Sequence, residues 1–300
     1  MHPALSVLLL TTLIGAGQGL FITMVVVELL AAGSVTPGFF VGGTAIVLVL
    51  CGLGLIASFF HLGHPERAWR TATMWRTSWL SREVIALPAF MGAVFAYGVA
   101  HWTGAGPTLA IGVLGSLLSL LLFVCTGMIY AAVKVLKEWA HPLTVVNFTT
   151  MGLASGTCLA TAYAGFAAPE LVGALAKAAF TLTALAMVTR GAALLRNAQL
   201  RPTSTLQSAL GIRHPKIVQK TQGSMGGSFN TREFFHGKSA AFVRGILTAA
   251  LFGAFVLPLV LVITLPILAF VVQYAGLLAE RWYFFAEAQH PQNLYYQGVS

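Results

Sequence analysis

Long runs of apolar residues, separated by short polar stretches, make up most of this chain. A helix that crosses a membrane needs about 20 predominantly apolar residues. The runs are continuous and lack the strict alternation of an outer-membrane β-barrel. The expected fold class is therefore all-α, a polytopic membrane protein with about eight transmembrane helices in a bundle. The predicted spans are 4–32, 38–61, 83–102, 108–134, 144–167, 170–195, 240–260 and 263–285.

The two ends of this pattern need separate interpretation. The first run lacks a basic leader and is too long for the apolar region of a signal peptide, so we expect it to be a membrane helix. The last two spans are nearly fused. Because proline breaks or kinks helices, Pro258 and Pro266 are expected to mark the tight turn between them.

Composition supports a membrane environment for the whole chain. Of the 300 residues, 57% are hydrophobic and only 8% are charged, and no Asp occurs. Soluble domains carry about 25% charged residues, so this chain cannot cover itself with a hydrated surface. We expect residues 1–300 to form a single membrane domain without a soluble domain of its own.

The charges are distributed unevenly between the two faces of the predicted bundle. Of the 17 Lys and Arg residues, all except Lys177 fall on the face that carries the connections after the second, fourth and sixth spans. Cationic residues near span ends collect on the cytoplasmic side. Eight spans then place both termini in the cytoplasm, and the expected location is the bacterial inner membrane.

The sequence does not favour a haem or metal site. None of the eight His residues falls in the middle of a predicted span, whereas a bis-His haem needs two such ligands in facing helices. His61 and His64 have a spacing that could share a metal, but no nearby carboxylate or Cys completes the set. The three Cys residues form no CxxC motif, so we expect neither zinc nor an Fe–S cluster in this chain.

Titratable groups at the span edges are the main candidates for chemistry. His61 ends the second predicted span and Glu83 starts the third, so the two can face each other across a short loop. His and Glu at an interface exchange protons readily, as reduction of a quinone requires. The structural alternatives are a His61 bonded to a carbonyl, and a Glu83 that pairs with Arg67 or Arg82 or stabilises the helix dipole.

Two further polar residues lie inside the first predicted span. Gln18 stands among glycines that let another helix approach closely, and Glu28 lies toward the far end. Structural hydrogen bonds between helices are the more common role of such residues. They are also the only residues that suggest a proton path through the bundle.

Two hydrophilic segments are candidates for contact with a partner. The second connection combines Trp with Arg, which fits either a helix at the headgroup layer or a docking surface for a soluble protein. Residues 196–239 are basic and contain a Gly- and Ser-rich stretch, so they are flexible or order against a partner. The candidate docking residues in the second connection are Trp69, Arg70, Trp75, Arg76 and Trp79.

The run His61-Leu-Gly-His-Pro-Glu-Arg-Ala-Trp-Arg, continuing to Trp79-Leu-Ser-Arg-Glu83, resembles the membrane anchor subunits of the dimethyl sulfoxide reductase family. The resemblance implies a haem-free anchor in a three-subunit complex. A molybdenum bis-pterin guanine dinucleotide subunit and a ferredoxin-like subunit with four Fe–S clusters would be its partners, and quinone its substrate. The resemblance makes His61 and Glu83 the proton-exchanging groups, and the proposed quinone site adds His64, Arg67, Arg82 and Gln18.

The resemblance leaves two kinds of complex open. One oxidises sulfite in the cytoplasm and reduces quinone, and the other oxidises quinol to reduce dimethyl sulfoxide, polysulfide or tetrathionate. Electrons tunnel only short distances, so the Fe–S subunit must lie beside the quinone site. That site is on the basic, cytoplasmic face, which favours the sulfite-oxidising type. A transporter and a purely structural anchor are the rival classes, and the chain alone gives neither the substrate nor the quinone type.

Overall fold

The computed structural model describes residues 1–31, 33, 35–60, 62–201, 205–218 and 236–290. Within these residues the secondary structure is helical and no strand is present, which confirms the all-α class. The helices are α1 (Leu5–Leu30), α2 (Pro37–Phe59), η1 (Pro65–Met74), α3 (Trp79–Thr103), α4 (Thr108–Ala131), α5 (Pro142–Ala167), η2 (Pro169–Leu171), α6 (Val172–Ala198), α7 (Leu206–Leu210), α9 (Ala240–Leu251), η4 (Phe252–Val256), α10 (Leu257–Leu261) and α11 (Pro266–Glu287).

Seven helical segments of the described chain are long and apolar enough to cross a membrane. They correspond to the first seven predicted spans, with α9, η4 and α10 joined in the seventh. The eighth predicted span corresponds to α11, a helix of 22 residues that packs against α5 and α9. Helix α11 is not among the seven segments and carries charged residues in its second half, so the eighth crossing stays a prediction.

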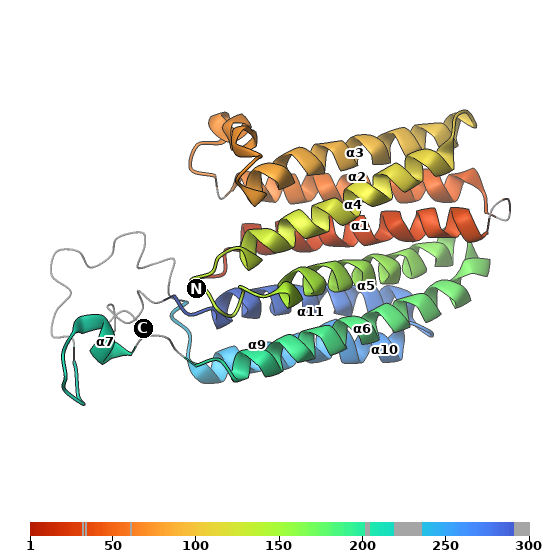
Figure 1. Cartoon of the computed structure of the whole chain (residues 1–300). Helices are drawn as coiled ribbons and strands as arrows, with labels where there is room; N and C mark the ends of the chain where they lie inside the picture. The colour runs from red at the N-terminus through yellow and green to blue at the C-terminus, as the bar shows by residue number, and fades with distance from the viewer. Residues whose placement is uncertain (32, 34, 61, 202–204, 219–235, 291–300) are drawn as a thin grey trace.

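Both ends of the described chain lie at the same end of the bundle (Figure 1). The Met1 ammonium group donates a hydrogen bond to the Ala288 carbonyl, 3.0 Å away, directly after α11. Helices η1 and α7 also lie at this end. We call it the basic end, and we call the opposite end, with the α3–α4 connection, the far end.

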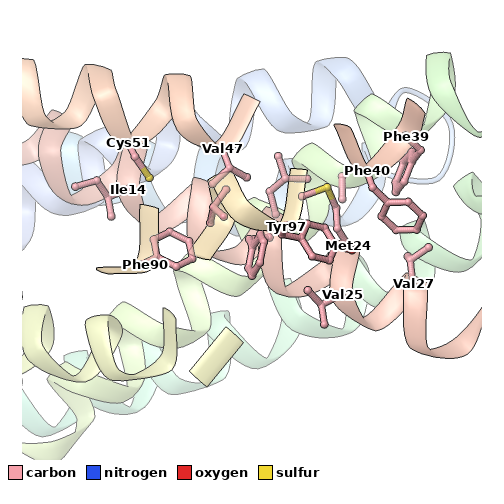
Figure 2. Packing of buried hydrophobic residues seen from close by; sticks show 14 of the residues in the cluster. Ile14, Met24, Val25, Val27, Phe39, Phe40, Val47, Cys51, Phe90 and Tyr97 are labelled. Atoms are coloured by element: carbon pink, nitrogen blue, oxygen red, sulfur yellow. The ribbon is translucent and has the colours of Figure 1, made fainter. Parts of the chain in front are cut away.

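Helix α1 is central and packs against α2, α4 and α5. Its aromatic contacts form much of the main core, where the Phe21 ring meets the rings of Phe90 and Tyr97 edge to face, 5.6 and 5.3 Å away. Figure 2 shows Phe90 and Tyr97 among the buried side chains of this cluster. These contacts join α1 to α3 across the bundle.

The turn between the last two predicted spans lies between Pro258 and Pro266 as expected, but Pro258 itself is helical. A single interrupted helix runs from α9 through the π-helical segment η4 into α10, and Pro258 lies inside α10. Proline has no N–H to donate, and a π-helical turn directly before it changes the hydrogen-bonding register, so the helix continues. The chain turns at residues 262–265, and Pro266 begins α11 as expected.

Candidate functional site

Helix α3 begins four residues earlier than predicted, and this changes the position of Glu83. The Ser78 hydroxyl caps the helix by accepting a hydrogen bond from the Ser81 N–H. Serine is among the preferred residues at this position because its oxygen satisfies a free N–H of the first turn. Glu83 therefore lies in the second turn of α3 rather than at its start, and it is only partly exposed.

The Glu83 carboxylate reaches into the bundle. The Thr126 hydroxyl of α4 donates a hydrogen bond to Glu83 Oε1. Both side chains line a cavity of about 30 Å³ enclosed by α1, α3, α4, α5 and α11. The other polar side chains in its wall are Thr11, Thr12, Gln18, Ser155 and Arg281. We call it the inner cavity. Its volume suits one or two water molecules rather than a quinone ring.

Gln18 is the second predicted site residue at the inner cavity. Its side-chain amide donates to the Ser119 carbonyl of α4 at 2.7 Å, so it ties α1 to α4. This agrees with the structural role expected from the sequence. The structure thus brings Glu83 and Gln18 to one cavity although 65 positions separate them in the chain.

The other predicted quinone-site residues lie outside the inner cavity. His61 lies outside the described residues. His64 and Arg67 are exposed and contact Glu66, at 3.0 and 3.7 Å. Arg82 donates to the carbonyls of Trp75 and Arg76 at 2.9 and 2.8 Å, closing the loop between η1 and α3. In the described part of the chain, none of these cations forms an ion pair with Glu83.

The candidate docking residues lie on and after η1 at the basic end. Trp69 and Trp75 are 67% and 52% exposed. Three guanidinium groups lie over indole rings, Arg70 over Trp69 at 5.5 Å, Arg76 over Trp75 at 5.4 Å and Arg82 over Trp79 at 4.2 Å. This segment therefore presents a surface of aromatic rings and positive charge beside the start of α3.

The sequence placed Arg190 and Arg281 among the charges of the basic face, but the structure buries both inside the bundle. Arg190 of α6 and Arg281 of α11 flank Glu280, with N–O distances of 2.7 and 2.6 Å. Arg190 also lies 3.5 Å from Glu287. Because α6 and α11 continue past these positions, the charges face neighbouring helices instead of water. The sequence did contain a signal for this cluster, because residues of opposite charge, Arg190 and Glu280, lie inside two predicted spans.

Glu28 and His101 meet at the far end. Glu28 accepts hydrogen bonds from Tyr97 at 2.8 Å and from Thr108 at 2.5 Å. His101 Nε2 lies 3.5 Å from the same carboxylate, and its ring stacks on Phe40 at 4.3 Å. These contacts join α1, α2, α3 and the start of α4, which is a structural role.

Among the described residues, no three His, Cys, Asp or Glu side chains come together as a metal site would require. Cys51, Cys125 and Cys158 are buried and form no disulfide.

Comparison with known proteins identifies the family. The model of the DMSO reductase anchor subunit (DmsC) matches residues 1–225. The chain belongs to this family of membrane anchors. It is also 53% identical to a subunit of the sulfite dehydrogenase of Allochromatium vinosum, over an alignment of 325 positions that covers all of both chains.

Membership of this anchor family gives the coarse function. The chain is the membrane anchor of an oxidoreductase complex of the dimethyl sulfoxide reductase or sulfite dehydrogenase type. Such an anchor implies catalytic and electron-transfer partner subunits, which carry the chemistry of the soluble substrate. The resemblance drawn from residues 61–83 is therefore confirmed.

Proposed function

We propose that this chain is the quinone-reactive anchor of a sulfite-oxidising complex. The full-length identity of 53% to a sulfite dehydrogenase subunit carries this assignment. Oxidation of sulfite by water yields sulfate, two protons and two electrons, and reduction of a quinone to a quinol takes up two electrons and two protons. A partner with four Fe–S clusters passes the electrons one at a time, and a molybdenum bis-pterin guanine dinucleotide subunit oxidises sulfite.

Glu83 is the best-supported proton donor for the quinone. Its carboxylate lies at the basic end, keeps part of its surface exposed and faces a polar cavity on its inner side. We place the quinone ring between α2 and α3 on the outer side of Glu83, within reach of His61, because the inner cavity is too small for a ring. Glu83 and His61 deliver the two protons, with Arg82 and Arg67 nearby as fixed positive charges.

The partner subunits dock at the basic end in this proposal. The exposed indole and guanidinium groups of Trp69, Arg70, Trp75 and Arg76 suit a protein interface, where Trp and Arg are enriched. Contact there would set the nearest Fe–S cluster close to Glu83. The basic loop 196–239 would extend the same surface. The charge asymmetry makes this side cytoplasmic, in the bacterial inner membrane.

Replacement of Glu83 by Gln tests the site. The amide keeps the size of the side chain but cannot deliver a proton, so sulfite-dependent reduction of decylubiquinone should fall by about 100-fold or more. Sulfite oxidation with ferricyanide, which accepts electrons from the soluble subunits, should be unchanged. Native membranes that carry the complete complex provide both assays.

The second candidate, an anchor of a complex that reduces dimethyl sulfoxide with electrons from quinol, is favoured by the family model. The same membranes distinguish the two, since that complex would oxidise a quinol with dimethyl sulfoxide and would not oxidise sulfite. In Glu83→Gln, unchanged decylubiquinone reduction for the first candidate, or unchanged quinol oxidation for the second, would contradict the site assignment.

A further inference from the structure

The buried charges beside the inner cavity need an explanation beyond anchoring. Arg190, Glu280 and Arg281 are almost completely buried. Ionised groups inside a membrane bundle are expensive, and where they occur they commonly belong to ion or proton pathways. A purely structural contact between α6 and α11 would be served as well by apolar side chains.

Arg281 connects this cluster to Glu83. Its guanidinium group lies in the wall of the inner cavity together with Glu83, Thr12 and Gln18. Arg281 Nε is held by Glu280 at 2.6 Å, and the guanidinium carbon lies 4.0 Å from the centre of the Phe148 ring. Arg281 Nη1 is buried and has no hydrogen-bond partner in the described part of the chain. A buried donor without a partner is a site for ordered water.

A second, outer cavity lies on the other side of Arg281. It measures about 10 Å³, roughly the space of one water molecule. Arg281 and Phe148 line both cavities, so these two side chains form the wall between them. The remaining charged and polar side chains of the outer cavity are Glu138, His141, Thr144, Asn147, Arg190, Arg196, Asn197 and Glu280.

The outer cavity leads toward the surface of the basic end. Glu138 belongs to the connection between α4 and α5 and is partly exposed. Its Oε2 and the Oδ1 of Asn147 are buried acceptors without a hydrogen-bond partner among the described residues. These two acceptors belong to side chains that line the outer cavity, and the Arg281 donor belongs to the side chain between the two cavities, so a water chain would find polar partners along this strip.

We propose that this strip, from Glu83 through the inner cavity, past Arg281 and through the outer cavity to Glu138, is the path by which protons reach the quinone from the basic end. The inference rests on the proposed function. One proton enters at Glu138 for each quinone reduced, and it replaces the proton that leaves Glu83. Arginine does not release its proton in proteins, so water carries the protons past Arg281. Glu280 and Arg190 position the Arg281 guanidinium group.

Glu138→Gln tests the outer end of this path, in native membranes that carry the complete complex. The amide cannot take up a proton, so sulfite-dependent reduction of decylubiquinone should fall by about tenfold or more, with a larger solvent isotope effect in D₂O. Added formate, a small weak acid, should restore much of the rate. Activity with ferricyanide should be unchanged. Glu170→Gln, an exposed carboxylate of η2 outside both cavities, is the matched control.

A second variant blocks the path from within. Asn147→Leu keeps the side-chain size but replaces a polar wall of the outer cavity with an apolar one. It should slow decylubiquinone reduction in the same way, and formate should not restore the rate, because the block lies beyond the entry point.

The two proposals fail in different ways. If Glu83→Gln abolishes decylubiquinone reduction while Glu138→Gln and Asn147→Leu match the wild type, the path is wrong and the quinone site stands. If the two path variants lose activity without a larger isotope effect, their role is structural and the path is also wrong. If Glu83→Gln reduces decylubiquinone at the normal rate, the quinone site itself is wrong.

Discussion

His141 shows how one side chain at the basic end combines a structural and an electrostatic role. It precedes α5, and its Nδ1 accepts a hydrogen bond from the Leu143 N–H at 3.2 Å, which caps the helix. Burial lowers the pKa of His141 below its ordinary value of 6.5, and the nearby charge of Arg196 lowers it further. The cap requires a neutral ring, because a protonated Nδ1 cannot accept a hydrogen bond.

The lowered pKa predicts that His141 makes the protein less stable in acid. At a pH between the pKa of His141 in the folded protein and its pKa in the unfolded chain, the unfolded chain binds more protons. The free energy of unfolding therefore falls as the pH drops below about 6.5, and it levels off below the pKa of the folded protein. Asn is also a good cap and does not titrate. Thermal unfolding of the detergent-solubilised chain should therefore depend less on pH between about 7.5 and 5.5 in His141→Asn than in the wild type. Equal pH slopes would contradict the assignment.

The close packing of α1 against α5 is the clearest feature at the scale of elements. A Cβ added at Gly156 of α5 would lie 2.2 Å from the backbone of Gly19 and Leu20 in α1. A Cβ at Gly19 would lie 2.2 Å from the Gly152 carbonyl oxygen. Small residues at such spacing let the backbones of membrane helices touch. The glycines around Gln18 therefore have the role that the sequence suggested.

This contact predicts that Gly156→Ala destabilises the bundle by about 1–3 kcal/mol. The added methyl group meets backbone atoms, which no side-chain rotation can move aside, so the two helices must separate. Gly165→Ala is the control in the same helix, because a Cβ there meets no atom within 4 Å. Unfolding by sodium dodecyl sulfate, followed by circular dichroism, compares the two variants. Equal stability of both would show that α1 and α5 adjust without cost.

The hydrophobic pattern predicted the apolar elements well and their polar ends poorly. Continuous apolar runs determine where helices form, and seven predicted spans match helices of the structure. The predicted start of α3 was too late because Trp79 and Arg82 lower the hydropathy of the first turn. The Ser78 cap nevertheless begins the helix at Trp79. The turn before Pro266 was placed correctly, but Pro258 does not end its helix, because the preceding π-helical segment accommodates the proline.

The functional site was only partly predictable for a related reason. Glu83 and Gln18 stood out because polar residues are rare in apolar runs. Glu280 and Arg281 also lie in such a run, but counting charges by face treated Arg281 as a topology signal. The pairing of α6 with α11 that joins Arg190 to Glu280 is a tertiary contact between residues 90 positions apart. A single sequence carries no direct signal for that pairing.

At the scale of the whole molecule, the charge asymmetry assigns a side of the membrane to every proposed activity. Met1, η1, the connection between α4 and α5, and α7 lie at the basic end, and the far end carries few basic residues. Cationic residues near span ends stay on the cytoplasmic side. In the proposed orientation the quinone site, the proton entry and the docking surface would all face the cytoplasm, so the protons released by sulfite oxidation and those taken up by quinone would belong to the same compartment. That arrangement would conserve no energy through this chain.

Cysteine labelling measures this orientation directly. The three native Cys residues are buried, so an impermeant maleimide should label the wild-type chain weakly. Ala105→Cys places an exposed thiol in the α3–α4 connection at the far end, and Ser208→Cys places one on α7 at the basic end. Intact spheroplasts should be labelled only at position 105, and inside-out vesicles only at position 208. The reverse pattern would place the docking surface in the periplasm and favour the quinol-oxidising complex, because the Fe–S partner must lie on the same side as Glu83.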